Sequence, residues 1–316
     1  MLVPEIPIPA VVELARQAES LGYRRVWVPD EGLATRDVMV TMAAIAAATS
    51  SIEIGTGIVN PYSRHPALTA AAIASLDELS GGRAFLGLGA GGSLTLGPLG
   101  VDRPRPLIHV REAVEVARAL FSGDVVNING ETLTLKSASI AYGRPDIEIW
   151  FAGRGPKMLH QAGAIMDGVL LEFLHKPSLG NAIRTVRAGA DSTGNRPTLC
   201  YSTMVITDPQ RLEQVRPHMT YRLVDSPFAV KESLGITEDH TAAIRAAMAD
   251  GLDQAAKLIP DDWVEPFVIM GSVDECAAEL KLLRDQHSFD EFMLVVADME
   301  DAATIMAEVA EVLERV

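Results

Sequence analysis

Two adjacent carboxylates, Asp30 and Glu31, follow a short apolar segment, Arg25–Val28, that we expect to be a buried strand. Catalytic groups of barrel-type α/β proteins gather at the carboxyl ends of such strands. Glu31 could serve there as a general acid or base if burial raised its pKa. An exposed loop carboxylate would have the same sequence, so the pattern leaves both interpretations of Glu31 open.

Glycine-rich loops follow the next two predicted strands, 52–58 and 85–88. In a parallel β-α-β unit these loops lie at the same edge of the sheet. Because they carry little side-chain bulk, a flat ligand can lie against their backbone. We therefore expect a ring-shaped cofactor to contact Gly57, Ile58, Val59, Gly89, Ala90 and Gly91. Asn60 either hydrogen-bonds the ring edge or the substrate, or only caps its own loop.

A third candidate is the segment Gly153-Arg154-Gly155-Pro156-Lys157, which comes after a predicted strand and opens a predicted helix. Backbone N–H groups at the start of a helix are unpaired and attract anions. Proline fits the first helical turn because its missing N–H is not needed there. The segment is therefore a candidate phosphate site, although a generic strand–loop–helix turn would look much the same.

Strand and helix patterns alternate along the whole chain. Helical spacing of apolar residues and short apolar runs predict strands at 25–28, 52–58, 85–88, 147–151, 167–171, 198–206 and 291–296, and helices at 11–21, 38–48, 66–79, 106–121, 156–165, 178–190, 273–286 and 300–315. This alternation predicts a (β/α)8 barrel, a single domain over 1–316. Two insertions are expected in it: a hairpin within 123–146, with Asn129-Gly130 as a tight two-residue turn, and a helical segment, 209–262.

Composition excludes several classes of protein. The net charge of −15 argues against nucleic acid and anionic membrane as partners. No run of about 18 apolar residues predicts a membrane span, and the first residues do not resemble a signal peptide. The two cysteines, Cys200 and Cys276, lack metal-ligand spacing and are expected to be reduced thiols of a cytoplasmic protein.

Several segments in the same order resemble the luciferase-like flavin and deazaflavin oxidoreductases. They are Gly-Tyr-Arg-Arg-Val-Trp-Val-Pro-Asp at 22–30, Arg-His-Pro at 64–66, Leu-Asp-Glu-Leu-Ser-Gly-Gly-Arg-Ala-Phe-Leu-Gly-Leu-Gly at 76–89 and Phe-Ala-Gly-Arg-Gly-Pro-Lys at 151–157. Within that superfamily the sequence is most similar to the methylenetetrahydromethanopterin reductases, which use coenzyme F420.

The resemblance implies a hydride-transferring enzyme that acts on a small organic substrate, with a methylene-tetrahydropterin as its most specific form. It implies a cis peptide bond at Gly57-Ile58 behind the cofactor ring, cofactor contacts from Asp30, and phosphate binding at 153–157. Asp30, Glu31 and Asn60 would position the ring edge or the substrate. A homodimer is also implied. If the cofactor is F420, its anionic tail would favour basic residues at the rim, with Arg64, Arg103 and Arg105 as candidates.

The sequence departs from the family at three positions. Relatives commonly have histidine where this chain has Glu31, several deazaflavin enzymes have an acidic residue where it has Gly92, and the reductases carry a glutamate where Met1 falls. Two alternatives therefore stay open. One is an FMN-dependent monooxygenase on the same fold, and the other is a luciferase-like barrel without catalytic activity.

Overall fold

The computed structural model describes residues 1–296 and 298–316. The chain forms two compact units. Unit 1 comprises Met1–Glu172 and Ala182–Cys200, and unit 2 comprises Phe173–Asn181 and Tyr201–Val316. The candidate site predicted from the sequence lies in unit 1.

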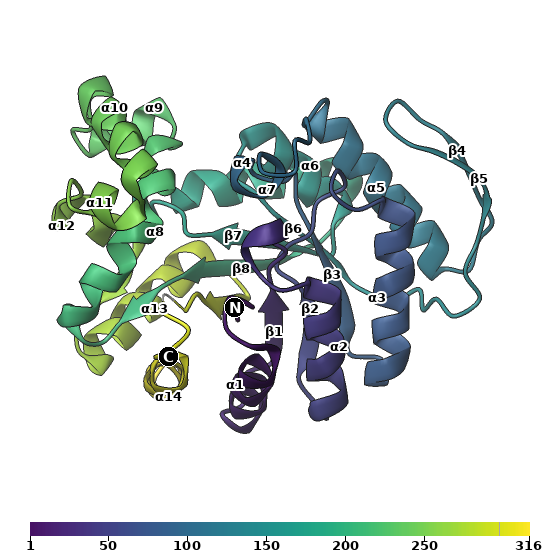
Figure 1. Cartoon of the computed structure of the whole chain (residues 1–316), viewed down its shortest axis with the longest axis horizontal. Helices are drawn as coiled ribbons and strands as arrows, with labels where there is room; N and C mark the ends of the chain where they lie inside the picture. The colour runs from purple at the N-terminus through teal and green to yellow at the C-terminus, as the bar shows by residue number, and fades with distance from the viewer. Residues whose placement is uncertain (297) are drawn as a thin grey trace. The chain divides into compact units, whose positions relative to one another are not determined.

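Unit 1 alternates strands with helices, as expected (Figure 1). Its elements are α1 (Ile8–Ser20), β1 (Arg25–Val28), η1 (Gly32–Ala34), α2 (Val38–Ala48), β2 (Glu53–Thr56), α3 (Pro66–Ser80), β3 (Ala84–Leu88), α4 (Ser93–Leu96), α5 (Pro106–Phe121), β4 (Val126–Asn129), β5 (Thr134–Ala138), β6 (Ile149–Ala152), α6 (Pro156–Ile165) and β7 (Gly168–Glu172), with most of α7 (Leu179–Thr193) and the start of β8 (Thr198–Thr203).

The strands form a parallel sheet. β1 pairs with β2, β2 with β3, β3 with β6, and β6 with β7, all in parallel. Within unit 1 the strand order is β1-β2-β3-β6-β7-β8. The predicted α/β class is therefore confirmed. Since all strands of a parallel sheet point the same way, their carboxyl ends meet at one edge.

An aromatic cluster forms the core beneath that edge. The indole of Trp27 lies 4.5 Å from the Phe85 ring and 5.3 Å from the Trp150 ring, both edge-on. All three side chains are buried, and the Arg25 guanidinium covers Trp150 at 4.7 Å. A Cβ atom at Gly55 would lie 2.3 Å from the Phe85 ring, so this strand position requires glycine. The aromatic residues on these strands are therefore core residues.

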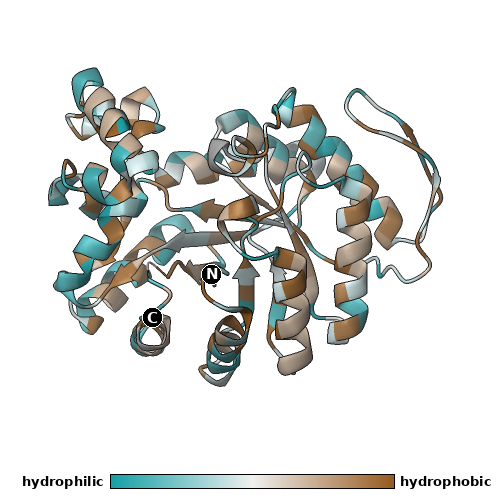
Figure 2. Ribbon diagram, viewed as in Figure 1, coloured by the Kyte–Doolittle hydropathy of each residue, from teal (hydrophilic) through white to brown (hydrophobic). Residues whose placement is uncertain are grey.

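Helices α1, α2 and α3 lie side by side in unit 1 (Figure 1). Asp37 begins α2, because its carboxylate accepts hydrogen bonds from the N–H groups of Met39 and Val40. Figure 2 shows α2 in brown and tan along almost its whole length, as its Ala-rich sequence requires. A helix that is apolar on most of its faces packs on more than one side.

The hairpin is present, but its predicted two-residue turn is wrong. Strands β4 and β5 pair antiparallel with Asn129 opposite Thr134, so four residues, 130–133, form the loop. The reason lies on α5, where the buried Glu112 carboxylate accepts hydrogen bonds from the N–H groups of Glu131, Thr132 and Leu133 and from the Thr132 hydroxyl. A Cβ atom at Gly130 would lie 2.5 Å from this carboxylate, so glycine is needed there for close approach rather than for a primed turn.

Unit 2 contains the rest of β8 and the remaining elements. These are η2 (Lys176–Ser178), β9 (Val205–Ile206), η3 (Pro209–Arg211), α8 (Leu212–Val224), α9 (Phe228–Ser233), α10 (Glu238–Ala247), η4 (Met248–Asp250), α11 (Leu252–Ala256), α12 (Asp261–Val264), η5 (Glu265–Phe267), β10 (Ile269–Met270), α13 (Val273–His287), β11 (Glu291–Leu294) and α14 (Ala302–Leu313). The segment predicted as one strand over 198–206 is divided into β8 and β9, and β9 pairs with β10 in a separate parallel sheet. Among the described residues no helix has the length and the apolar run needed to cross a membrane.

Candidate functional site

The segment after β2 lies between the ends of β1 and β3. The Gly57–Ile58 peptide bond is cis, as the resemblance implied. The Gly57 N–H donates to the Val28 carbonyl at 2.7 Å, and the Val59 N–H donates to the Gly87 carbonyl at 3.0 Å. In return the Gly89 N–H donates to the Val59 carbonyl at 2.9 Å. These backbone bonds place the predicted cofactor-contacting residues of β2 and β3 beside each other.

Ile58 packs directly on Gly89. A Cβ atom at Gly89 would lie 2.0 Å from Ile58 Cδ1 and 2.9 Å from the carbonyl oxygen of Ala152, at the end of β6. At Gly91, where φ is +74°, a Cβ atom would lie 3.2 Å from Cβ of Asn60. Three strand ends therefore converge here, and only glycine fits at position 89.

Two further glycines of the same loops have space in front of them. A Cβ atom at Gly92, after β3, or at Gly155, after β6, would meet no atom within 4 Å. Neither glycine has a positive φ. At these two positions the absence of a side chain leaves room beside the backbone, in contrast to Gly89, where the room is filled by Ile58.

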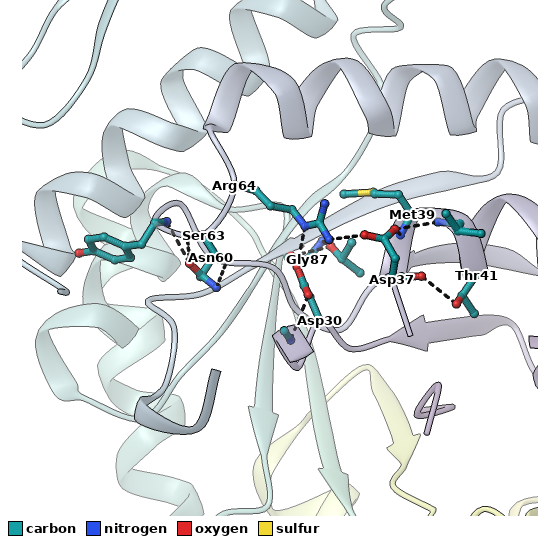
Figure 3. A network of polar contacts seen from close by, with 12 residues as sticks. Asp30, Asp37, Met39, Thr41, Asn60, Ser63, Arg64 and Gly87 are labelled. Atoms are coloured by element: carbon teal, nitrogen blue, oxygen red, sulfur yellow. Dashed lines mark hydrogen bonds and ion pairs between the residues drawn. The ribbon is translucent and has the colours of Figure 1, made fainter. Parts of the chain in front are cut away.

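Asp30 is buried and paired with Arg64 (Figure 3). The Nε atom of Arg64 lies 2.7 Å from Oδ2 of Asp30, and its Nη2 atom lies 2.7 Å from Oδ2 of Asp37. The Asp30 N–H group also points at the Ile58 carbonyl at 3.4 Å. Arg64, predicted as a cation for an anionic tail, is therefore engaged with two carboxylates of its own unit, and its contact with such a tail stays a prediction.

Asn60 is 3% exposed and organises its own loop. Its side-chain oxygen accepts hydrogen bonds from the N–H groups of Tyr62 and Ser63, and its amide donates to the Ser63 hydroxyl at 2.9 Å (Figure 3). These contacts fit the second of the two interpretations, a loop cap. Its contact with a ring or substrate stays a prediction.

Glu31 is partly buried and lies near two other carboxylates, Glu172 and Asp30. Burial raises the pKa of its carboxyl group, and Glu172 at the end of β7 and the neighbouring Asp30 raise it further. A hydrogen bond from the Thr95 hydroxyl, 3.1 Å from Oε2 of Glu31, opposes these effects. A carboxyl group whose pKa is raised in this way can hold and release a proton nearer neutral pH than an exposed one.

The segment predicted to bind an anion, 153–157, begins α6 without a side-chain cap. Gly155 is the residue before the helix, the described residues show no side-chain cap hydrogen bond there, and Pro156 occupies the first turn. Within the described part of the chain, neither Arg154 nor Lys157 takes part in an ion pair. The start of a helix attracts anions, and Arg154 and Lys157 flank this one in the sequence, so anion binding here stays a prediction.

The other cations predicted for the rim are placed differently from one another. Arg105 forms an ion pair with Glu131 of the hairpin loop at 2.6 Å. Arg103 donates a hydrogen bond to the Gly91 carbonyl. Among the residues that the structure describes, no group of three or more His, Cys, Asp or Glu could hold a metal ion.

Sequence reasoning missed Thr95 and the role of Asp37. Asp37 could have been recognised as the N-cap of α2, because an aspartate directly precedes an apolar helical run. No sequence pattern marks Thr95, because its contact with Glu31 joins residues 64 positions apart.

A model of the luciferase-like monooxygenase family matches residues 1–291. The chain therefore belongs to this family. It is 33% identical over 90% of its length to 5,10-methylenetetrahydromethanopterin reductase of Methanolobus tindarius, covering 89% of that protein. It is 31% identical to the same enzyme of Archaeoglobus fulgidus, over 86% of this chain and 85% of that one.

Solved structures agree with these relatives. The coenzyme F420-dependent tetrahydromethanopterin reductase of Methanopyrus kandleri superposes with a TM-score of 0.88 at 26% identity, covering 98% of this chain and 95% of that one. The oxygenating constituent of 3,6-diketocamphane monooxygenase of Pseudomonas putida, in complex with FMN, superposes with a TM-score of 0.70 at 17% identity, covering 99% of this chain and 95% of that one. The second similarity shows the shared fold alone.

Proposed function

We propose that this chain is a coenzyme F420-dependent oxidoreductase that transfers hydride between the deazaflavin and an organic substrate, a methylene-tetrahydropterin. The observation that carries the proposal is the glycine-lined edge of β2, β3 and β6, where Ile58 lies against Gly89 and space opens beside Gly92 and Gly155. The reductases to which the chain is similar support the choice of F420 over FMN.

The residues at this edge fit such a cofactor. Ile58 and Val59 would support the back of its ring, Gly89, Ala90 and Gly91 would admit the ring, and the first turn of α6 with Arg154 and Lys157 would hold its phosphate. When bound, the reduced deazaflavin supplies a hydride. Everything else in the reaction is the task of this chain: to orient the substrate, exclude water and deliver a proton.

We assign the proton to Glu31. Delivery of a hydride to the methylene carbon of a tetrahydropterin forms a C–H bond and breaks one C–N bond, and the released nitrogen takes up a proton. Glu31 in its protonated form would donate that proton and become a carboxylate, which water then reprotonates. Asp30, held by Arg64, and Asn60 would fix the loops on either side. The raised pKa of Glu31 supports this role, and Gly92 cannot fill it because glycine carries no acid.

Three further properties belong to the proposal. The parallel sheet would close as a (β/α)8 barrel, with 123–146 and 209–262 as insertions in one domain. The protein would form a homodimer through α2 and α3, which expose Val40, Leu68 and Leu79 to solvent.

Leu68→Glu should then convert the dimer to a monomer, which analytical ultracentrifugation would detect as a lower molecular mass. We place the protein in the cytoplasm, a compartment that keeps thiols such as those of its two buried cysteines reduced.

Cofactor titration tests the central proposal. Purified protein is titrated with F420 and, separately, with FMN, while cofactor fluorescence is followed. Tight binding of F420 alone is expected. Lys157→Ala should weaken F420 binding and leave binding of the phosphate-free deazaflavin nucleoside unchanged. Tight binding of FMN alone would indicate a monooxygenase. Failure of both to bind at tens of micromolar, an affinity weaker than about −6 kcal/mol, would favour a barrel without catalytic activity.

A further inference from the structure

Among the residues that the structure describes, only Thr95 is seen to donate a hydrogen bond to the Glu31 carboxyl group. Its hydroxyl lies 3.1 Å from Oε2 of Glu31. Thr95 is 7% exposed, so this hydrogen bond is shielded from water on the Thr95 side. A neutral hydroxyl that donates to a carboxyl oxygen favours the ionised form of that carboxyl group.

The backbone around this contact is closely fitted. Gly32, directly after Glu31, has a φ of +60°, and a Cβ atom there would lie 3.3 Å from the Thr95 carbonyl oxygen and 3.4 Å from its Cγ2 atom. The η1 turn and α4 therefore approach each other at Gly32 and Thr95. This backbone packing holds Thr95 close to Glu31, and the short side chain of threonine has little freedom to move away.

The charged groups near Glu31 act in the opposite direction to Thr95. Glu172 at the end of β7 and Asp30 beside Glu31 both disfavour a second negative charge. The charge of Asp30 is offset by Arg64 at 2.7 Å. Burial and Glu172 thus keep the proton on Glu31, and Thr95 is the group that makes its release easier.

We propose that Thr95 is a positioning residue, which aims the Glu31 carboxyl group and keeps it able to exchange its proton under the conditions of the reaction. The relevance of Thr95 to catalysis rests on the proposed function, in which Glu31 is the acid. The contact itself does not, because it can be measured in the protein without cofactor.

Carboxyl-carbon NMR of the protein without cofactor tests this inference. The Glu31 signal is assigned by its absence in Glu31→Gln, and its chemical shift is followed with pH in the wild type, Thr95→Val and Thr95→Ser. Valine keeps the shape of threonine without its hydroxyl, and serine keeps the hydroxyl. A hydrogen bond to a charged group of about 1.5 kcal/mol corresponds to roughly a tenfold change in an acid dissociation constant.

Thr95→Val is expected to raise the pKa of Glu31 by weakening its acid dissociation about tenfold, and Thr95→Ser to restore it. Thermal unfolding of both variants verifies that they fold. An unchanged Glu31 titration in folded Thr95→Val would overturn the inference. The cofactor titration tests the proposed function separately. If F420 does not bind but Thr95→Val changes the Glu31 titration, the proposed function is wrong and the inferred effect of Thr95 on Glu31 is still supported. If F420 binds, the pH profile of kcat should move upward in Thr95→Val and return in Thr95→Ser.

Discussion

The guanidinium group of Arg64 joins Asp30, at the end of β1, to the Asp37 carboxylate that begins α2. Each of its two contacts measures 2.7 Å. The two carboxylates differ in burial, because the Asp30 side chain is 6% exposed and that of Asp37 is 45% exposed. Breaking the Asp30 contact by removing Arg64 should therefore cost more stability than breaking the Asp37 contact, because it leaves a buried carboxylate without its partner.

Arg64→Gln is expected to destabilise the protein by about 2 kcal/mol, less than a fully buried pair would lose, since Arg64 is partly exposed. The cost arises because Asp30 keeps a buried charge without its partner. Urea unfolding measures it. The double variant Asp30→Asn/Arg64→Gln should be more stable than Arg64→Gln alone. Equal stability of the two variants would show that the pair does not hold Asp30 in place.

Glu112→Gln is expected to destabilise the protein by about 2 kcal/mol and to loosen the 130–133 loop, because an amide –NH2 cannot accept the hydrogen bonds that the second carboxylate oxygen accepts. Hydrogen exchange at the N–H groups of Glu131, Thr132 and Leu133 should accelerate. Glu115→Gln, on the exposed face of the same helix, is the control and should change neither quantity.

The same carboxylate predicts a dependence on pH. Burial acts to raise the pKa of Glu112, but the hydrogen bonds from the Thr132 hydroxyl and three N–H groups outweigh it, and the pKa is lowered. Because its folded-state pKa is below the ordinary value, the stabilisation is complete above the ordinary value and is lost as pH falls through the folded-state pKa. The difference between wild type and Glu112→Gln should shrink in that window.

Local signals predicted much of the fold because they act within one element. Helix α2 begins and ends as predicted because Asp37 caps an unbroken apolar run, and α5 does so because Pro106 fits its first turn. The Asn129-Gly130 turn was wrong because the Glu112 carboxylate, far away in sequence, organises the loop. A local turn preference was overridden by a buried charge that needs hydrogen bonds.

The site shows the same limit. The glycines and the cis bond at Gly57-Ile58 were predictable from a pattern shared with a family. The pairing of Arg64 with Asp30 was not predictable. The sequence does not distinguish an arginine that binds a ligand from one that pairs with a carboxylate of its own chain. The contact of Thr95 with Glu31 was not predictable either, because α4 and η1 come together only in the folded chain.

Gly89→Ala is expected to lower F420 affinity at least tenfold and to reduce stability, because the new Cβ atom would lie 2.0 Å from Ile58 Cδ1 and 2.9 Å from the Ala152 carbonyl oxygen. Backbone and Ile58 must shift, and both belong to the proposed ring site. Gly92→Ala is the matched control for stability, since its Cβ atom meets nothing within 4 Å. Thermal unfolding and fluorescence titration check the pair. If Gly89→Ala binds F420 like the wild type, the ring does not rest at this edge.

Glu31→Gln is expected to increase the stability of the protein at neutral pH and to leave it unchanged in acid. Burial, Glu172 and Asp30 raise the pKa of Glu31 above its ordinary value of 4.5, so the folded state holds this proton more tightly than the unfolded state does. Folding stability therefore falls as pH rises from about 4.5 to the folded-state pKa and is constant beyond it, by about 1.4 kcal/mol for each unit of difference. Glutamine carries no charge and avoids this loss. Urea unfolding of wild type and Glu31→Gln at pH values from 4 to 8 measures the difference, with the exposed Glu78→Gln as control. A difference that does not grow above pH 4.5 would mean that Glu31 is not perturbed and would remove it as the proposed acid.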